Sequence, residues 1–94
     1  KLQADAQYWL GRVYFAQKKY EEAAIAMAEF NSIFPNDPRF QETTLLIAEA
    51  AVNFAPKNQL CDILKQSLEF MVNPSEKFVK RINSLKNEKK CSAE

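Results

Sequence analysis

The sequence contains no histidine and a single glycine among its 94 residues. Without histidine the chain cannot build a Ser-His-Asp or Cys-His nucleophile, a histidine general base or a histidine metal site. One glycine, Gly11, excludes the phosphate-binding and dinucleotide-binding loops, which need several glycines within one turn. Because no remaining side chains pair a nucleophile with a base, we predict that the protein is not an enzyme and uses no cofactor.

Cysteines and long apolar runs are also scarce. The two cysteines, Cys61 and Cys91, lie 30 residues apart. A zinc ribbon needs more cysteines at closer spacing, so we predict no metal site. The longest apolar run, Ala23–Ala28, has six residues, whereas a membrane helix needs about 20, so we predict no membrane insertion. The chain begins at Lys1 without a basic, apolar leader, and we interpret it as a piece of a longer protein.

Charge is nearly balanced overall but unevenly distributed along the chain. The net charge is +1, yet residues 77–94 carry six basic and two acidic side chains, against seven and ten in residues 1–76. The basic end lacks the interleaved aromatic residues that stack on bases, so we predict no nucleic-acid partner. We interpret it as a solvated helix face whose late lysines complement the helix dipole.

Apolar residues recur every three or four positions and no segment alternates with a period of two, which predicts an all-α fold. The expected helices span about residues 3–17, 20–33, 38–54, 57–71 and 74–88. Asp37 before Pro38 and Asn73 before Pro74 are helix-start signals, the second strengthened by Glu76. One apolar face of the first helix is expected to consist of Ala6, Leu10, Val13 and Tyr14.

Two helix pairs repeat with an offset of 37 residues, which aligns Gly11 with Ala48 and Ala23 with Leu60. Residues 4–37 resemble one tetratricopeptide repeat in the order and spacing of Trp9, Leu10, Gly11, Tyr14, Tyr20, Ala23 and Pro35. We expect Gly11 and Ala23 where the two helices cross, because small side chains let backbones approach. Residues 38–73 form a degenerate second copy, residues 74–88 a capping helix and residues 89–94 a tail. The predicted architecture is therefore one domain, an α-solenoid of two tetratricopeptide-like hairpins and a capping helix.

A closer family resemblance lies in the run Ala4-Asp5-Ala6-Gln7-Tyr8-Trp9-Leu10-Gly11, followed by Tyr14-Phe15-Ala16-Gln17 and Pro35-Asn36-Asp37-Pro38. These residues are similar to the C-terminal tetratricopeptide domain of the periplasmic YbgF/CpoB family, which works with the Tol–Pal system. The resemblance implies a non-enzymatic periplasmic adaptor that binds the Tol energy-transducing protein and links envelope constriction to peptidoglycan synthesis. It also implies oligomerisation through a coiled coil outside this chain. The resemblance is specific over residues 4–38 and weak beyond about residue 42.

The first helices of stacked hairpins are expected to line a concave groove that binds an amphipathic helix or an extended peptide. The predicted partner-binding residues are Asp5, Tyr8, Arg12, Phe15, Glu42, Leu45, Glu49 and Val52. The alternative is an oligomerisation or scaffold module of another envelope protein, in which no groove is in use. Tyr8 and Phe15 in an open groove would favour binding, and the same rings covered within the monomer would favour the scaffold.

The periplasmic location that the resemblance implies, together with the even cysteine count, predicts a disulfide between Cys61 and Cys91. In a straight hairpin of the last two helices, Cys61 faces roughly Ser84, so Cys91 overshoots by about 10 Å. The bridge therefore requires the last helix to end near residues 86–88 and the chain to fold back. Asn87 is the expected stop, because asparagine tolerates left-handed backbone angles.

Overall fold

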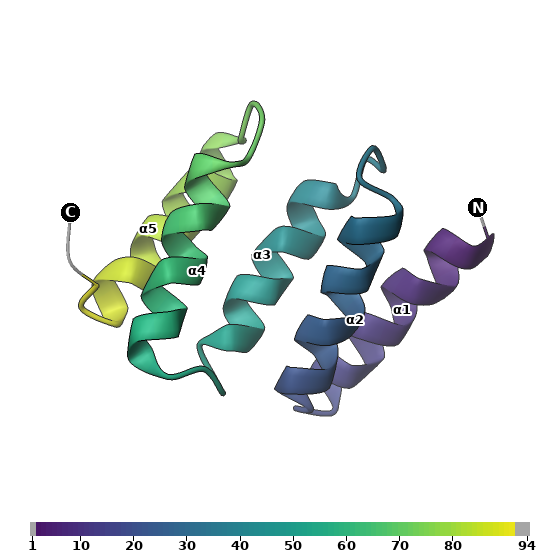
Figure 1. Cartoon of the computed structure of the whole chain (residues 1–94), viewed down its shortest axis with the longest axis horizontal. Coiled ribbons are helices and arrows are strands. Elements are labelled where there is room, and N and C mark those ends of the chain that lie inside the picture. The colour runs from purple at the N-terminus through teal and green to yellow at the C-terminus, as the bar shows by residue number, and fades with distance from the viewer. Residues whose placement is uncertain (1, 92–94) are drawn as a thin grey trace.

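A computed structural model describes residues 2–91 of the chain, and it describes side chains from residue 3 onward. The described part is all-helical, which confirms the predicted all-α class, and its helices follow one another across the molecule (Figure 1). They are α1 (Leu2–Ala16), α2 (Tyr20–Ile33), α3 (Phe40–Ala51), α4 (Lys57–Glu69) and α5 (Glu76–Glu88). Consecutive helices pack against each other, and α3 also contacts α5, so α3 is the central helix.

The start of α3 differs from the prediction. The α-helix begins at Phe40 rather than at residue 38, after a turn over residues 38–39, and Arg39 occupies the N-cap position. Asp37 still satisfies a free donor there, because its carboxylate accepts the backbone N–H of Arg39 at 2.9 Å. The same carboxylate binds the Arg39 guanidinium at 2.9 Å and 3.1 Å, which holds the turn in place.

The start of α5 is a second correction. Ser75, not Asn73, caps the helix, and its hydroxyl accepts the backbone N–H of Phe78 at 3.1 Å. Asn73 has a φ of 52°, a left-handed conformation that asparagine tolerates better than most residues. An N-cap residue needs extended angles, so the conformation of Asn73 excludes it from that role.

Two clusters of buried side chains form the core, and α3 contributes to both. The first cluster joins α1 to α2 and comprises Ala4, Tyr8, Met27 and Phe30, with Phe34, Leu46 and Ile47 packed against it. The second joins α3, α4 and α5 and comprises Ala48, Ala51, Leu60, Leu64, Phe78, Ile82 and Leu85. Helix α3 therefore links the two clusters, with Ala48 and Ala51 in one and Leu46 and Ile47 packed against the other.

Gly11 lies where α1 meets α2, as the sequence predicts. Its backbone is buried, and a Cβ atom at this position would lie 2.7 Å from Cε of Met27. Met27 is itself 1% exposed, and Ala23 on the same helix is equally buried. The small residues therefore allow the close approach of the two helices.

The apolar face that the sequence predicts for the first helix does not pack against the rest of the molecule. Ala6, Leu10 and Val13 are exposed, whereas Ala4, Tyr8 and Gly11 face α2. The error has a physical cause, since α1 is apolar around most of its circumference. Periodicity selects a face only when the opposite face is polar.

The C-terminal end carries the predicted disulfide. Cys61 and Cys91 are bonded, with their Cα atoms 5.6 Å apart. Helix α5 ends at Glu88, within the expected range, and the Cys91 backbone N–H donates to the carbonyl of Lys86 at 2.9 Å. The expected stop at Asn87 is wrong, because Lys90 is the residue with left-handed angles, at φ 57°. Residues 92–94 of the predicted tail lie outside the described residues.

Candidate functional site

Tyr8, Arg12 and Glu42 form a polar bridge between α1 and α3. The Tyr8 hydroxyl donates to the Glu42 carboxylate, and Arg12 donates to both, at 2.9 Å to the hydroxyl and 2.9 Å to the carboxylate. The ring of Tyr8 packs near Phe30, and the Arg39 guanidinium lies 4.9 Å from its centroid, within cation–π range. These contacts leave Tyr8 only 6% exposed.

The predicted partner-binding residues of α1 are therefore not an open groove wall. The expectation that Tyr8 lines an open groove is wrong, because the ring belongs to the first core cluster. Phe15 is half-buried and contacts the ring of Tyr20 edge-on, with the centroids 5.4 Å apart. Asp5 is paired with Arg39 at 2.9 Å. By the criterion stated above, the covered Tyr8 favours the scaffold alternative for the α1 half of the chain.

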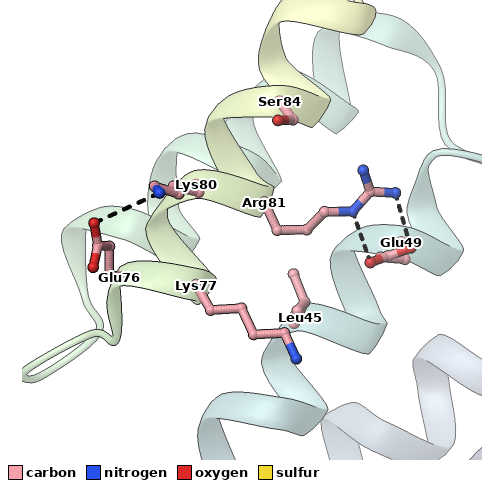
Figure 2. A pocket seen from close by; sticks show the side chains of 7 residues that line it. All are labelled: Leu45, Glu49, Glu76, Lys77, Lys80, Arg81 and Ser84. Carbon is pink, nitrogen blue, oxygen red and sulfur yellow. Dashed lines mark hydrogen bonds and ion pairs between the residues drawn. The ribbon is translucent and has the colours of Figure 1, made fainter.

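Among the second group of predicted residues, Glu42, Leu45 and Glu49 do line an open groove, whereas Val52 packs against the second core cluster. The groove runs between α3 and α5 and consists of two adjoining hollows of about 700 Å³ and 470 Å³ that share Leu45 and Lys77. Figure 2 shows the larger hollow, where Lys77 reaches from α5 toward Leu45 on α3. Its remaining lining residues are Glu49, Glu76, Lys80, Arg81 and Ser84.

The charges of this α3–α5 groove are only partly paired. Arg81 donates twice to the Glu49 carboxylate, at 3.0 Å and 3.3 Å, and these hydrogen bonds raise the pKa of the guanidinium (Figure 2). Lys80 and Glu76 form an exposed pair at 3.6 Å, a kind of contact that contributes little stability. Within residues 3–91, Lys77 has no carboxylate partner. The groove therefore presents one uncompensated cation beside the apolar side chain of Leu45.

The α5 wall was missed as a site by reasoning from the sequence. Lys77, Lys80, Arg81 and Ser84 follow a spacing of three or four residues, which places them on one side of α5. The opposite side carries Phe78, Ile82 and Leu85 in the core. The pattern was visible as an amphipathic helix, but it does not show whether the polar side meets solvent or a neighbouring helix. That α5 lies beside α3 is a tertiary fact.

The described residues hold no group of three or more histidine, cysteine or acidic side chains that could bind a metal ion. None of the helices within residues 2–91 combines the length and the hydropathy needed to cross a bilayer. Comparison of the chain with protein-family models, curated sequences and solved structures finds no match.

Tyr8 provides a direct test of the polar bridge. Burial raises the pKa of its phenol, and the hydrogen bond and negative charge of Glu42 raise it further, while Arg12 acts in the opposite direction. We expect Tyr8 to remain protonated above about pH 10, where a free tyrosine ionises. Because the fold favours the neutral phenol, its contribution to stability is present below that pH and is lost as the pH rises through the raised pKa.

The measurement is a near-ultraviolet titration of tyrosinate in the folded protein, which has three tyrosines. The last tyrosine to ionise should disappear in Tyr8→Phe and should remain in Tyr14→Phe. If Tyr8→Phe leaves the last ionisation step in place, the bridge does not hold the phenol as described.

Proposed function

We propose that the protein is a non-enzymatic interaction module that holds a segment of another protein in the groove between α3 and α5. The observation that carries this proposal is the unpaired Lys77 beside Leu45. The acidic residues that line the groove each have another cation as partner: Glu42 with Arg12, Glu49 with Arg81 and Glu76 with Lys80. A partner with an acidic side chain next to an apolar one complements both features. Such mixed contacts are typical of peptide-recognition surfaces.

The dimensions of the groove favour a peptide over a small metabolite. Its α3 wall extends from Gln41 to Glu49, a separation of eight positions, which is about 12 Å at a helical rise of 1.5 Å. An extended segment of about four residues, at 3.3 Å each, has the same length. The groove is open to solvent rather than enclosed, which suits a peptide better than a buried small molecule.

A library of displayed peptides, selected on the immobilised chain, tests the proposal. We expect enrichment of peptides that place aspartate or glutamate beside an apolar residue. The affinity of a selected peptide, measured by fluorescence anisotropy, should fall about tenfold in Lys77→Glu, equivalent to about 1.4 kcal/mol. Added salt should weaken binding to the native chain, because the contact is exposed and charged.

The matched control is Lys65→Glu, which makes the same charge change at an exposed position of α4. It should leave the affinity unchanged. Selected peptides that bind Lys77→Glu as tightly as the native chain, or that lose equal affinity in Lys65→Glu, would contradict a groove site.

At a finer level, we propose that the helices form a tetratricopeptide-like α-solenoid and that the protein is a periplasmic adaptor resembling the YbgF/CpoB family. The pattern of residues 4–38 supports the family, and the Cys61–Cys91 disulfide supports an oxidising compartment. The partner would then be the Tol energy-transducing protein. Titration of the chain with the purified Tol protein tests the family assignment separately. Selected peptides can bind the groove even if the Tol protein does not.

A second candidate function is a scaffold or oligomerisation module with no ligand in its groove. The covered ring of Tyr8 favours it, since the α1 half of the expected groove is closed by the protein's own side chains. The peptide selection separates the two candidates. A groove without function yields no peptide whose affinity depends on Lys77.

A further inference from the structure

The Cys61–Cys91 bridge holds the helix that forms one wall of the α3–α5 groove. One side of α5 lines the groove, and the bridge joins the end of the same helix to the beginning of α4. Beyond Glu88 the chain folds back, and the Cys91 backbone N–H donates to the carbonyl of Lys86 at 2.9 Å. The position of this wall therefore depends on a bond that reduction breaks.

The other attachments of α5 lie toward its N-terminal end and its middle. The Ser75 backbone N–H donates to the Gln41 side chain at 2.6 Å, and Arg81 donates to Glu49 at 3.0 Å and 3.3 Å. The residues that α5 buries in the core are Phe78, Ile82 and Leu85. Past Leu85 every residue of α5 is partly or fully exposed, so the bridge fixes the last turn of the helix.

Two lysines favour attack on the bridge by a thiol. Lys57 and Lys65 lie one turn before and one turn after Cys61 and share its side of α4, whereas the adjacent Asp62 faces another side. Their positive charge stabilises a thiolate at Cys61, which makes Cys61 the better leaving group. Cys91 is partly exposed, so an attacking thiol can reach its sulfur.

We propose that the Cys61–Cys91 bridge is a redox switch, whose reduction releases α5 from α4 and dismantles the α3–α5 groove. The inference rests on the proposed function, because it regulates the same groove. The reductant is a dithiol. One of its thiolates attacks the sulfur of Cys91 and the Cys61 thiolate leaves, and its second thiol then displaces Cys91 from the mixed disulfide. Two electrons and two protons pass to the protein, which gains two thiols, while the reductant becomes a disulfide.

Reduction converts a covalent attachment into a local equilibrium. In the reduced chain α5 detaches and docks again, and a peptide binds only the docked form, so its dissociation constant rises by the inverse of the docked fraction. We expect a rise of about tenfold, which corresponds to docking in about one-tenth of the reduced molecules. Helices α1 and α2 should keep their structure, because the first core cluster contains no residue of α4 or α5.

Amide hydrogen exchange tests the release of α5 without a peptide. The native chain is compared with and without dithiothreitol, a dithiol, at a temperature at which circular dichroism shows the reduced chain to be helical. Exchange in α5 should become about tenfold faster or more on reduction, exchange in α1 and α2 should not change, and reoxidation should restore the original pattern. Unchanged exchange in α5 overturns the proposal. So does an equal loss of protection in α1 and α2, because the bridge would then hold the whole domain together rather than one wall of the groove.

Fluorescence anisotropy of a peptide selected on the oxidised chain tests the consequence for the groove. The dissociation constant should rise about tenfold in dithiothreitol and recover on reoxidation. Cys61→Ser/Cys91→Ser should bind as weakly as the reduced chain and should not respond to the reductant. A peptide affinity that reduction leaves unchanged overturns the switch. A selection that yields no peptide overturns the proposed function instead, and hydrogen exchange still decides whether α5 is released.

The rate of reduction tests the role of the two α4 lysines. Lys57→Gln/Lys65→Gln should be reduced severalfold more slowly than the native chain, because the Cys61 thiolate loses its stabilising charge. The matched control, Lys18→Gln/Lys19→Gln, removes two exposed lysines between α1 and α2 and should be reduced at the native rate. Equal rates in the two variants would overturn the assignment of Cys61 as the leaving thiolate.

Discussion

Replacement of both Cys61 and Cys91 by serine is expected to lower the free energy of unfolding by about 3–4 kcal/mol. The bridge closes a loop between residues 30 apart, and the chain-entropy model assigns roughly 3.7 kcal/mol to a loop of that size. A domain of this size has about 5–15 kcal/mol of stability in total, so the loss is a large fraction of it. The thermal midpoint should fall by about 12–30 °C, measured by circular dichroism.

The loss should be concentrated in α5, because the bridge joins the end of that helix to the beginning of α4. Reduction of the native protein should lower its thermal midpoint as far as the double substitution does, and the same reductant should not affect the double variant. Two free thiols per chain in unfolded, unreduced protein would contradict the bridge itself.

Substitution of Gly11 by leucine is expected to destabilise the protein by about 3 kcal/mol or more. A Cβ atom at Gly11 would lie 2.7 Å from Cε of Met27 and 3.0 Å from its Cγ and Sδ atoms. Met27 is 1% exposed and has no free space to enter, so the larger side chain must separate α1 from α2. Overpacking of this kind costs typically about 1–3 kcal/mol, and separation of the helices also exposes Phe30.

Urea unfolding of Gly11→Leu and two controls measures this effect. Gly11→Ala should cost less, because its methyl group meets the flexible end of the Met27 side chain rather than backbone. Ala28→Leu introduces the same side chain at an exposed position of α2 and should change stability little. A native midpoint for Gly11→Leu would mean that α1 does not pack against α2 through this residue.

The positions and most ends of the helices could be predicted from the sequence, because they depend on residues within about one turn. Apolar periodicity located all five helices of the described region, and the bounds of α2 were predicted to the residue. The errors at helix starts were also local in cause. Asn73 was expected as a cap, but its backbone has left-handed angles. Ser75, two residues later, caps the helix instead.

The two faces of α1 and the location of the groove were decided by tertiary contacts. The ring of Tyr8 is covered because its hydroxyl meets Glu42, 34 residues away, and because Arg39 lies over it. No pattern within α1 contains that information, since either side of an apolar helix can be the buried one.

Of the two walls of the groove, the α3 wall could be predicted from the sequence and the α5 wall could not. Leu45 and Glu49 were expected to face it from their spacing along one helix, and they do line it. Lys77 and Arg81 became part of it only because α5 packs beside α3 and places Arg81 against Glu49, 32 residues apart in sequence. Spacing determines which residues share a side of a helix, whereas the burial of apolar surface by neighbouring helices determines what that side meets.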